Sequence, residues 1–132
     1  MSDNFYNSET GIDFGNSITL STNWAGAFTG AVNIRYYKLG QIVIIDWPGT
    51  AQVAGSPGSV TLTDNLPAGF RPPFDYTGPL LRVNNNAVVS IGTIQIAAAT
   101  GQIFWYGGLN FDNFTGPGGS NIFAGSISFL AA

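Results

Sequence analysis

The sequence predicts an all-β domain, an antiparallel β-sandwich or jelly roll with no significant helix. Three observations lead to this prediction. Short segments alternate apolar and polar residues with period 2, and turn residues separate them. The polar residues are mostly Ser, Thr, Asn, Gln and Gly, whereas Glu, Lys and Arg, on which surface helices depend, total only five.

The alternation is clearest where Val32, Ile34 and Tyr36 alternate with polar residues, and the apolar run 42–47 suits a strand covered on both faces. We expect the other strands at 18–21, 60–63, 80–83, 87–96, 102–106 and 122–130. Roughly eight to ten short strands at this spacing indicate a sandwich, jelly roll or barrel.

Turn signals mark where the strands end. Pro48-Gly49 and Thr100-Gly101 are two of them. The run Asn84-Asn85-Asn86 suits a hairpin tip, because asparagine tolerates a positive φ. A chain of 132 residues has the size of one domain, so we expect an N-terminal arm or linker at 1–15 and a single β-sandwich domain at 16–132.

Composition excludes several functions. The chain has no histidine and no cysteine, which removes zinc ribbons, disulfides and His- or Cys-based catalysis. A net charge of −3 with four basic residues argues against nucleic-acid binding. No apolar run approaches the roughly 18 residues of a membrane span. We therefore expect no enzyme activity, no cofactor, no metal and no membrane insertion.

The N-terminal sequence Met1-Ser2-Asp3-Asn4 lacks the basic and apolar regions of a signal peptide, so we expect synthesis in a cytoplasm. Charged residues are only 8% of the chain and apolar residues 45%. A chain of this composition has few surface charges to oppose association, which favours an obligate oligomer. The alternative is a large core under a neutral polar coat.

A proline-rich segment, Leu66–Pro79, interrupts the strand pattern. Its four prolines remove backbone donors, so we expect a rigid crossover anchored by Phe70 and Phe74. Arg71 has two possible roles there: binding loop carbonyls or a nearby aspartate, or contacting a ligand directly.

Within this segment the run Leu66-Pro67-Ala68-Gly69-Phe70-Arg71-Pro72-Pro73 resembles the Leu-Pro-x-Gly-Tyr/Phe-Arg-Pro signature of viral and phage fibre or receptor-binding heads. The residues that carry the motif are Leu66, Pro67, Gly69, Phe70, Arg71 and Pro72. The flanking run 30–40 and the final strand 125–130 agree with it.

The resemblance implies a trimeric jelly roll of the tumour necrosis factor and C1q type. It implies a non-enzymatic virion protein that attaches to a host-surface receptor, glycan or protein, and that contacts other virion proteins. A carbohydrate-binding β-sandwich module, monomeric or dimeric, is the first alternative. A purely architectural capsid protein is the second.

Aromatic residues beside asparagine and aspartate suit sugar binding, since a sugar's C–H face stacks on a ring while polar groups bind its hydroxyls. The candidate ligand-binding residues are Trp105, Tyr106, Asn110, Phe111, Asp112 and Tyr76. Such rings equally suit a core or a subunit contact.

Five aromatic residues are candidates for the core or for a three-fold axis: Tyr36, Phe104, Tyr106, Phe123 and Phe129.

Asp46 interrupts the apolar run 42–47. A carboxylate there requires a partner, so we expect it to pair with backbone amides or an arginine.

Overall fold

The computed structural model describes residues 6–7, 12–13, 17–50, 53–54, 57–115 and 119–132. This part consists of antiparallel strands and two single-turn 3-10 helices, so the all-β prediction is confirmed. In chain order the elements are β1 (Tyr6–Asn7), β2 (Ile12–Asp13), β3 (Ile18–Gly26), β4 (Gly30–Leu39), β5 (Ile42–Trp47), β6 (Val53–Ala54), β7 (Val60–Leu62), η1 (Ala68–Phe70), β8 (Tyr76–Asn85), β9 (Val88–Ile96), β10 (Ile103–Tyr106), η2 (Leu109–Phe111), β11 (Gly119–Ile122) and β12 (Gly125–Leu130).

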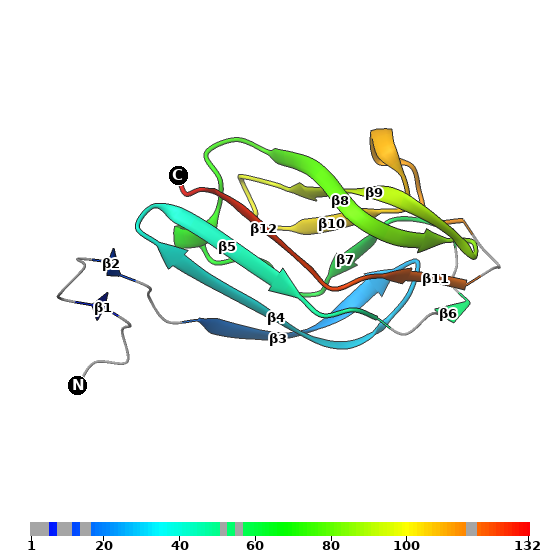
Figure 1. The fold of residues 1–132 in the computed structure, drawn as a ribbon, viewed down its shortest axis with the longest axis horizontal. Helices are drawn as coiled ribbons and strands as arrows, with labels where there is room; N and C mark the ends of the chain where they lie inside the picture. The colour runs from blue at the N-terminus through cyan, green and yellow to red at the C-terminus, as the bar shows by residue number, and fades with distance from the viewer. Residues whose placement is uncertain (1–5, 8–11, 14–16, 51–52, 55–56, 116–118) are drawn as a thin grey trace.

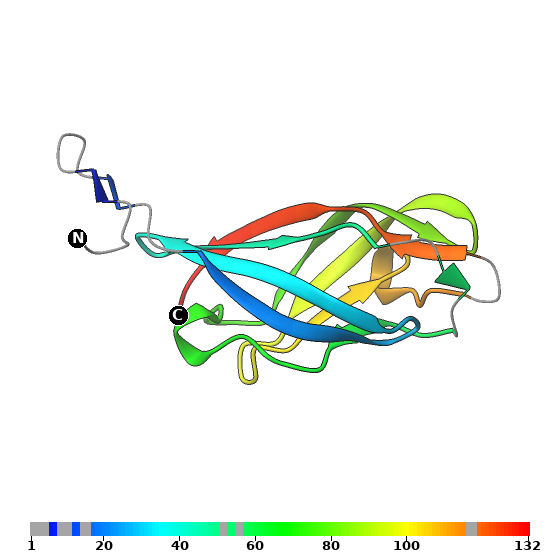
Figure 2. The same cartoon turned by 90° about the horizontal axis from the view of Figure 1, so that it is seen from below.

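Ten of the strands form one antiparallel sheet in the order β12-β5-β4-β3-β7-β10-β9-β8-β11-β6. The sheet curls so that its two halves face each other, as Figures 1 and 2 show. Tyr76 of β8 packs on Phe129 of β12 with ring centroids 5.6 Å apart, although these strands are seven places apart in the sheet. The result is a half-barrel of sandwich or jelly-roll type around one core.

The predicted arm at 1–15 is described only at β1 and β2. These form a separate two-stranded sheet in which Tyr6 pairs with Asp13 and Asn7 with Ile12. The other residues of that segment lie outside the described residues.

The period-2 pattern correctly identifies the inner face. On β4 the side chains of Val32, Ile34 and Tyr36 are buried, while Asn33 and Arg35 are exposed. Alternate side chains of a strand point to opposite faces, so one face of the curled sheet becomes apolar and the other polar.

The hairpin predicted at the asparagine run joins β8 to β9. β8 ends at Asn85, and the two turn residues Asn86 and Ala87 have φ of 53° and 65°. Two consecutive positive φ values match the twist of the flanking strands, as in a type I′ turn.

The strand predicted at 80–83 is longer in the structure and begins at Tyr76, inside the proline-rich segment. Pro79 pairs with Thr93, and the register shifts between Leu80 and Val83. The expectation of a non-strand crossover up to Pro79 is therefore wrong in its last four residues. A proline is tolerated in a strand beside such an irregularity, because the ladder there lacks regular hydrogen bonds.

The rest of the proline-rich loop is held mainly by Arg71. Its Nε donates to the Leu66 carbonyl at 2.9 Å and its Nη1 to the Ala99 carbonyl at 3.0 Å. This confirms the first of the two predicted roles, the binding of loop carbonyls. Phe70 is the predicted anchor and packs edge-on against Tyr36 at 4.7 Å. The prediction for Phe74 is wrong, because this side chain is 82% exposed.

Gly101 shows why this contact requires a glycine. Its φ is +75°, and a Cβ there would lie 2.3 Å from the Leu66 carbonyl oxygen and 2.7 Å from Nε of Arg71. The Leu66 amide donates to the Gly101 carbonyl at 2.9 Å. The turn between β9 and β10 can therefore pack against the loop only without a side chain.

Asp46 pairs with an arginine, one of the two kinds of partner predicted for it. Nη2 of Arg35 donates to Asp46 Oδ2 at 2.9 Å across the β4–β5 ladder. The hydrogen bond to Asp46, followed by its negative charge, raises the pKa of Arg35 above its usual value. The pair joins the two strands on their polar face.

Three tryptophans meet in the core. The Trp105 ring lies 4.9 Å from Trp24 and 5.9 Å from Trp47, edge to face in both cases. Trp47 donates its Nε1 to the Phe123 carbonyl at 2.9 Å. Trp105 is fully buried, and its Nε1 has no acceptor among the described residues. These rings join β3 and β5 to β10 across the interior.

Two of the five core or axis candidates, Tyr36 and Phe129, are buried in the core. Phe104, Tyr106 and Phe123 are half-buried, and the guanidinium of Arg82 lies 4.4 Å over the ring of Phe123. The single chain does not test a three-fold axis, so that part stays a prediction.

Phe129→Asp should prevent stable folding, because it places a carboxylate without a partner among apolar side chains. We expect the free energy of unfolding to fall by about 3–5 kcal/mol or more. Chemical denaturation followed by circular dichroism measures this value. Leu130→Asp is the control on the same strand, since Leu130 is 64% exposed, and it should cost less than about 1 kcal/mol. A stably folded Phe129→Asp protein would contradict the assignment of the core.

Candidate functional site

The loop after β10 presents apolar side chains to solvent. Leu109 is 52% exposed and Phe111 is 45% exposed. The loop is closed by two backbone hydrogen bonds, from Gly107 N to Asp112 O at 2.9 Å and from Asp112 N to Leu109 O at 3.4 Å. The exposed side chains therefore project from a defined turn.

The backbone of this loop is strained at two adjacent residues. Asn110 has φ of 58° and Phe111 has φ of 62°. The left-handed region costs an L-residue other than glycine about 1–2 kcal/mol, and asparagine tolerates it better than phenylalanine does. Phe111 thus combines an exposed ring with a backbone conformation that costs free energy.

Phe111 continues a row of rings on the outer face of β10. The rings of Phe104 and Tyr106 are stacked with centroids 6.3 Å apart, and Phe111 lies edge-on to Tyr106 at 5.2 Å. We call this surface the outer aromatic surface, and its members are Phe104, Tyr106, Leu109, Asn110 and Phe111.

Beside it lies a shallow hollow of about 370 Å³. The hollow is lined by Thr77, Gly78, Thr93, Leu109, Asn110 and Phe111. The Thr93 hydroxyl donates to the Gly108 carbonyl at 2.8 Å, which fixes the base of the loop against β9. Hydroxyl and amide groups thus stand next to an exposed ring, and every described side chain in the lining is uncharged.

Tyr106 supplies both a ring and a hydroxyl to this surface. Burial raises the pKa of Tyr106 above its usual value, so the hydroxyl is protonated at neutral pH. It can donate to Oε1 of Gln95, 3.2 Å away. The hydrogen bond to Gln95 and the edge-on contact with Phe111 therefore both restrict the position of the Tyr106 ring.

The structure brings together four of the six predicted ligand-binding residues. Tyr106, Asn110 and Phe111 lie on the outer aromatic surface, and Asp112 is exposed in the same loop. Trp105 and Tyr76 are not with them. Neighbouring side chains of a strand point to opposite faces, so Trp105 points into the core while Tyr106 points outward. Tyr76 packs against Phe129.

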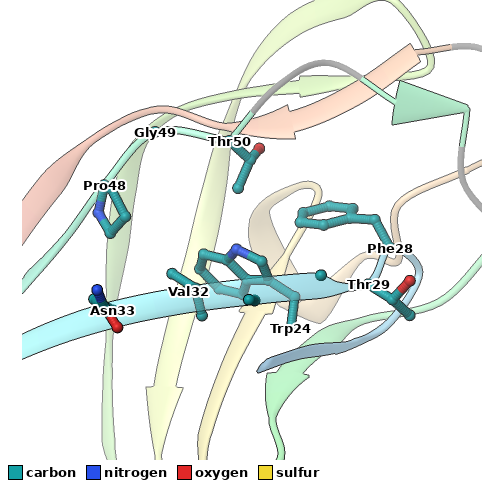
Figure 3. A pocket seen from close by; sticks show the side chains of 10 residues that line it. Trp24, Phe28, Thr29, Val32, Asn33, Pro48, Gly49 and Thr50 are labelled. Carbon is teal, nitrogen blue, oxygen red and sulfur yellow. The ribbon is translucent and has the colours of Figure 1, made fainter. Parts of the chain in front are cut away.

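Sequence reasoning missed a second hollow, which we call the β4 cleft. It measures about 540 Å³ and is lined by Trp24, Phe28, Thr29, Gly30, Ala31, Val32, Asn33, Pro48, Gly49 and Thr50. Figure 3 shows the Trp24 and Phe28 rings on one side and Pro48 and Thr50 across from them. Both rings are only 5% exposed, so the cleft offers little ring surface to a ligand.

The β4 cleft opens because two strands part. β4 pairs with β5 only from Arg35 to Leu39, and the chain after β5 turns towards β11, where Thr50 N donates to the Ile122 carbonyl at 2.9 Å. Pro48 has no N–H and cannot extend the ladder. Pro48-Gly49 is recognisable as a turn in the sequence, but only the tertiary structure shows that a hollow follows.

Among the described residues, no helix is long and apolar enough to cross a membrane. Within that same part of the chain, no group of three or more Asp or Glu side chains could hold a metal ion.

No family model matches the chain, and no curated protein matches it. Among solved structures it is similar to the reovirus attachment protein sigma1, a structure determined in complex with alpha-2,3-sialyllactose. The TM-score is 0.56 at 12% sequence identity, and the match covers 87% of this chain and 64% of that one. At this identity the likeness is one of fold, and the chain spans less than two thirds of that solved chain.

The strain at Phe111 can be measured by comparing two substitutions. Phe111→Ala and Phe111→Gly both remove the ring, but only glycine relieves the positive φ. We expect the glycine variant to be more stable than the alanine variant by about 1 kcal/mol in chemical denaturation. The control is Ala87→Gly, at φ of 65° in the β8–β9 turn. This variant should be more stable than the unaltered protein by a similar amount. Equal stability of the two Phe111 variants would show that the loop is not strained.

Proposed function

We propose that this chain is the head domain of a viral attachment protein, a non-enzymatic structural component of a virion. It assembles as a homotrimer and binds a host-surface glycan on the outer aromatic surface. Its other partners are the virion proteins that carry it. The exposed, strained Phe111 beside Tyr106 is the observation that supports binding most directly.

Two further observations support the attachment role. The half-barrel is similar in fold to a reovirus attachment protein, which was solved with a bound glycan. The proline-arginine motif that resembles the motif of fibre heads forms a packed loop here, with Leu66 fully buried and Pro72 buried. The fold likeness and the motif are independent of the aromatic surface.

Exposed apolar residues support assembly. Val88, Val89 and Ile91 are 64%, 58% and 53% exposed at the start of β9. Few charges protect the chain against association, so burial of these side chains between copies is favourable. A solvent-exposed apolar strand of this kind suits a subunit contact.

A glycan array with the purified chain tests the binding function. We expect binding to a defined set of glycans and a loss of about tenfold in affinity for Phe111→Ala, because stacking of a sugar on an aromatic ring contributes about 1–1.5 kcal/mol. Phe74→Ala is the matched control, since it removes another exposed ring, from the proline-rich loop. The absence of any glycan binding, or equal losses in both variants, would refute the function assigned to this surface.

Light scattering on a sizing column tests the assembly. A trimer has three times the 13.9 kDa mass of one chain and should persist on dilution. A monomer that still binds glycans through Phe111 would favour the carbohydrate-binding module. A trimer that binds none would favour a purely architectural virion protein.

A further inference from the structure

All four basic side chains of the chain are already engaged. Arg35 pairs with Asp46, and Arg71 donates to two loop carbonyls. Nζ of Lys38 lies 5.2 Å over the Phe70 ring, and the guanidinium of Arg82 lies 4.4 Å over the Phe123 ring. None of these side chains lines the hollow beside the outer aromatic surface.

The groups that do face this hollow are uncharged. Thr77 supplies a hydroxyl and Asn110 an amide, and Leu109 and Phe111 supply apolar surface. The hydroxyl of Thr93 is buried and already donates to the Gly108 carbonyl. A hydroxyl or amide can both donate and accept, which matches the hydroxyl groups of a sugar. A carboxylate, which only accepts, would find no cationic donor among these residues.

The nearest charge in the loop is negative. Asp112 directly follows Phe111 and is exposed, and the net charge of the chain is −3. A carboxylate on the ligand would therefore be repelled locally by Asp112 and at longer range by the whole molecule.

We propose that the outer aromatic surface selects uncharged sugars and discriminates against sialylated ones. This inference rests on the glycan-binding function proposed above and specifies the chemical class of its ligand. The surface stacks a neutral ring on Phe111 and binds its hydroxyls with Asn110 and Thr77. A terminal carboxylate loses hydration there without gaining an ion pair.

Matched glycan pairs that differ only in a terminal sialic acid test this directly. The pairs are presented on an array, and in solution lactose is compared with alpha-2,3-sialyllactose by calorimetry on the purified full chain. We expect the neutral members of the bound pairs to bind about tenfold more tightly, because the carboxylate is left without a cationic partner. We also expect affinity for the neutral members to be insensitive to salt, since no ion pair forms.

Two variants with the same change in net charge separate a local effect from a general one. Asp112→Asn removes the carboxylate beside Phe111, and Asp64→Asn removes an exposed carboxylate in the loop after β7. We expect Asp112→Asn to raise affinity for sialylated members about twofold, the effect of one charge across about 8 Å of water. Asp64→Asn should raise affinity for the sialylated members less than Asp112→Asn does, because it weakens only the long-range repulsion, and it should leave affinity for the neutral members unchanged.

The outcomes distinguish the two proposals. Tighter binding of sialylated members overturns the selection for uncharged sugars and leaves glycan attachment standing. Equal binding of both members of each pair overturns it as well. Binding of no glycan at all overturns attachment through this surface and the selectivity with it.

Discussion

The contact of three indole rings in the core links the two halves of the curled sheet. Trp24, Trp47 and Trp105 come from β3, β5 and β10, so they lie on different parts of the curled sheet. A ten-stranded sheet could remain open, but burying these large rings requires its two halves to face each other. The curl in turn brings β12 against β8 and leaves a single inner face for the core.

The motif that resembles viral heads serves this closure. Leu66 is buried, Phe70 packs on Tyr36, and Arg71 binds the carbonyls of Leu66 and Ala99. The backbone amide of Ala132 donates to the Arg71 carbonyl at 2.9 Å. One rigid loop therefore connects β4, the β9–β10 turn and the segment after β12, and it does so without lining either hollow.

Strand alternation gives the two faces of one strand different surroundings. On β10, Trp105 completes the core while Tyr106 and Phe104 face outward to the surface that Phe111 extends. Because the two faces are separated by the backbone, residues of the outer surface can vary without disturbing the indole contact. The scarcity of charge has a related effect: the basic side chains are engaged in packing and pairing, so the side chains around the hollow beside the outer aromatic surface are uncharged.

The sequence alone predicts the strand class, the alternation on β4, a hairpin at Asn84–Asn86 and a partner for Asp46, either backbone amides or an arginine. These features depend on local periodicity, on turn chemistry and on the cost of an unpaired charge, all of which a sequence displays. The folded structure settles that Trp105 faces inward and Tyr106 outward, since both are aromatic and the alternation allows either side chain to face the core. It also decided that Phe74 is exposed, that Phe111 has a positive φ and that a cleft opens after Pro48, because each depends on where distant strands pair.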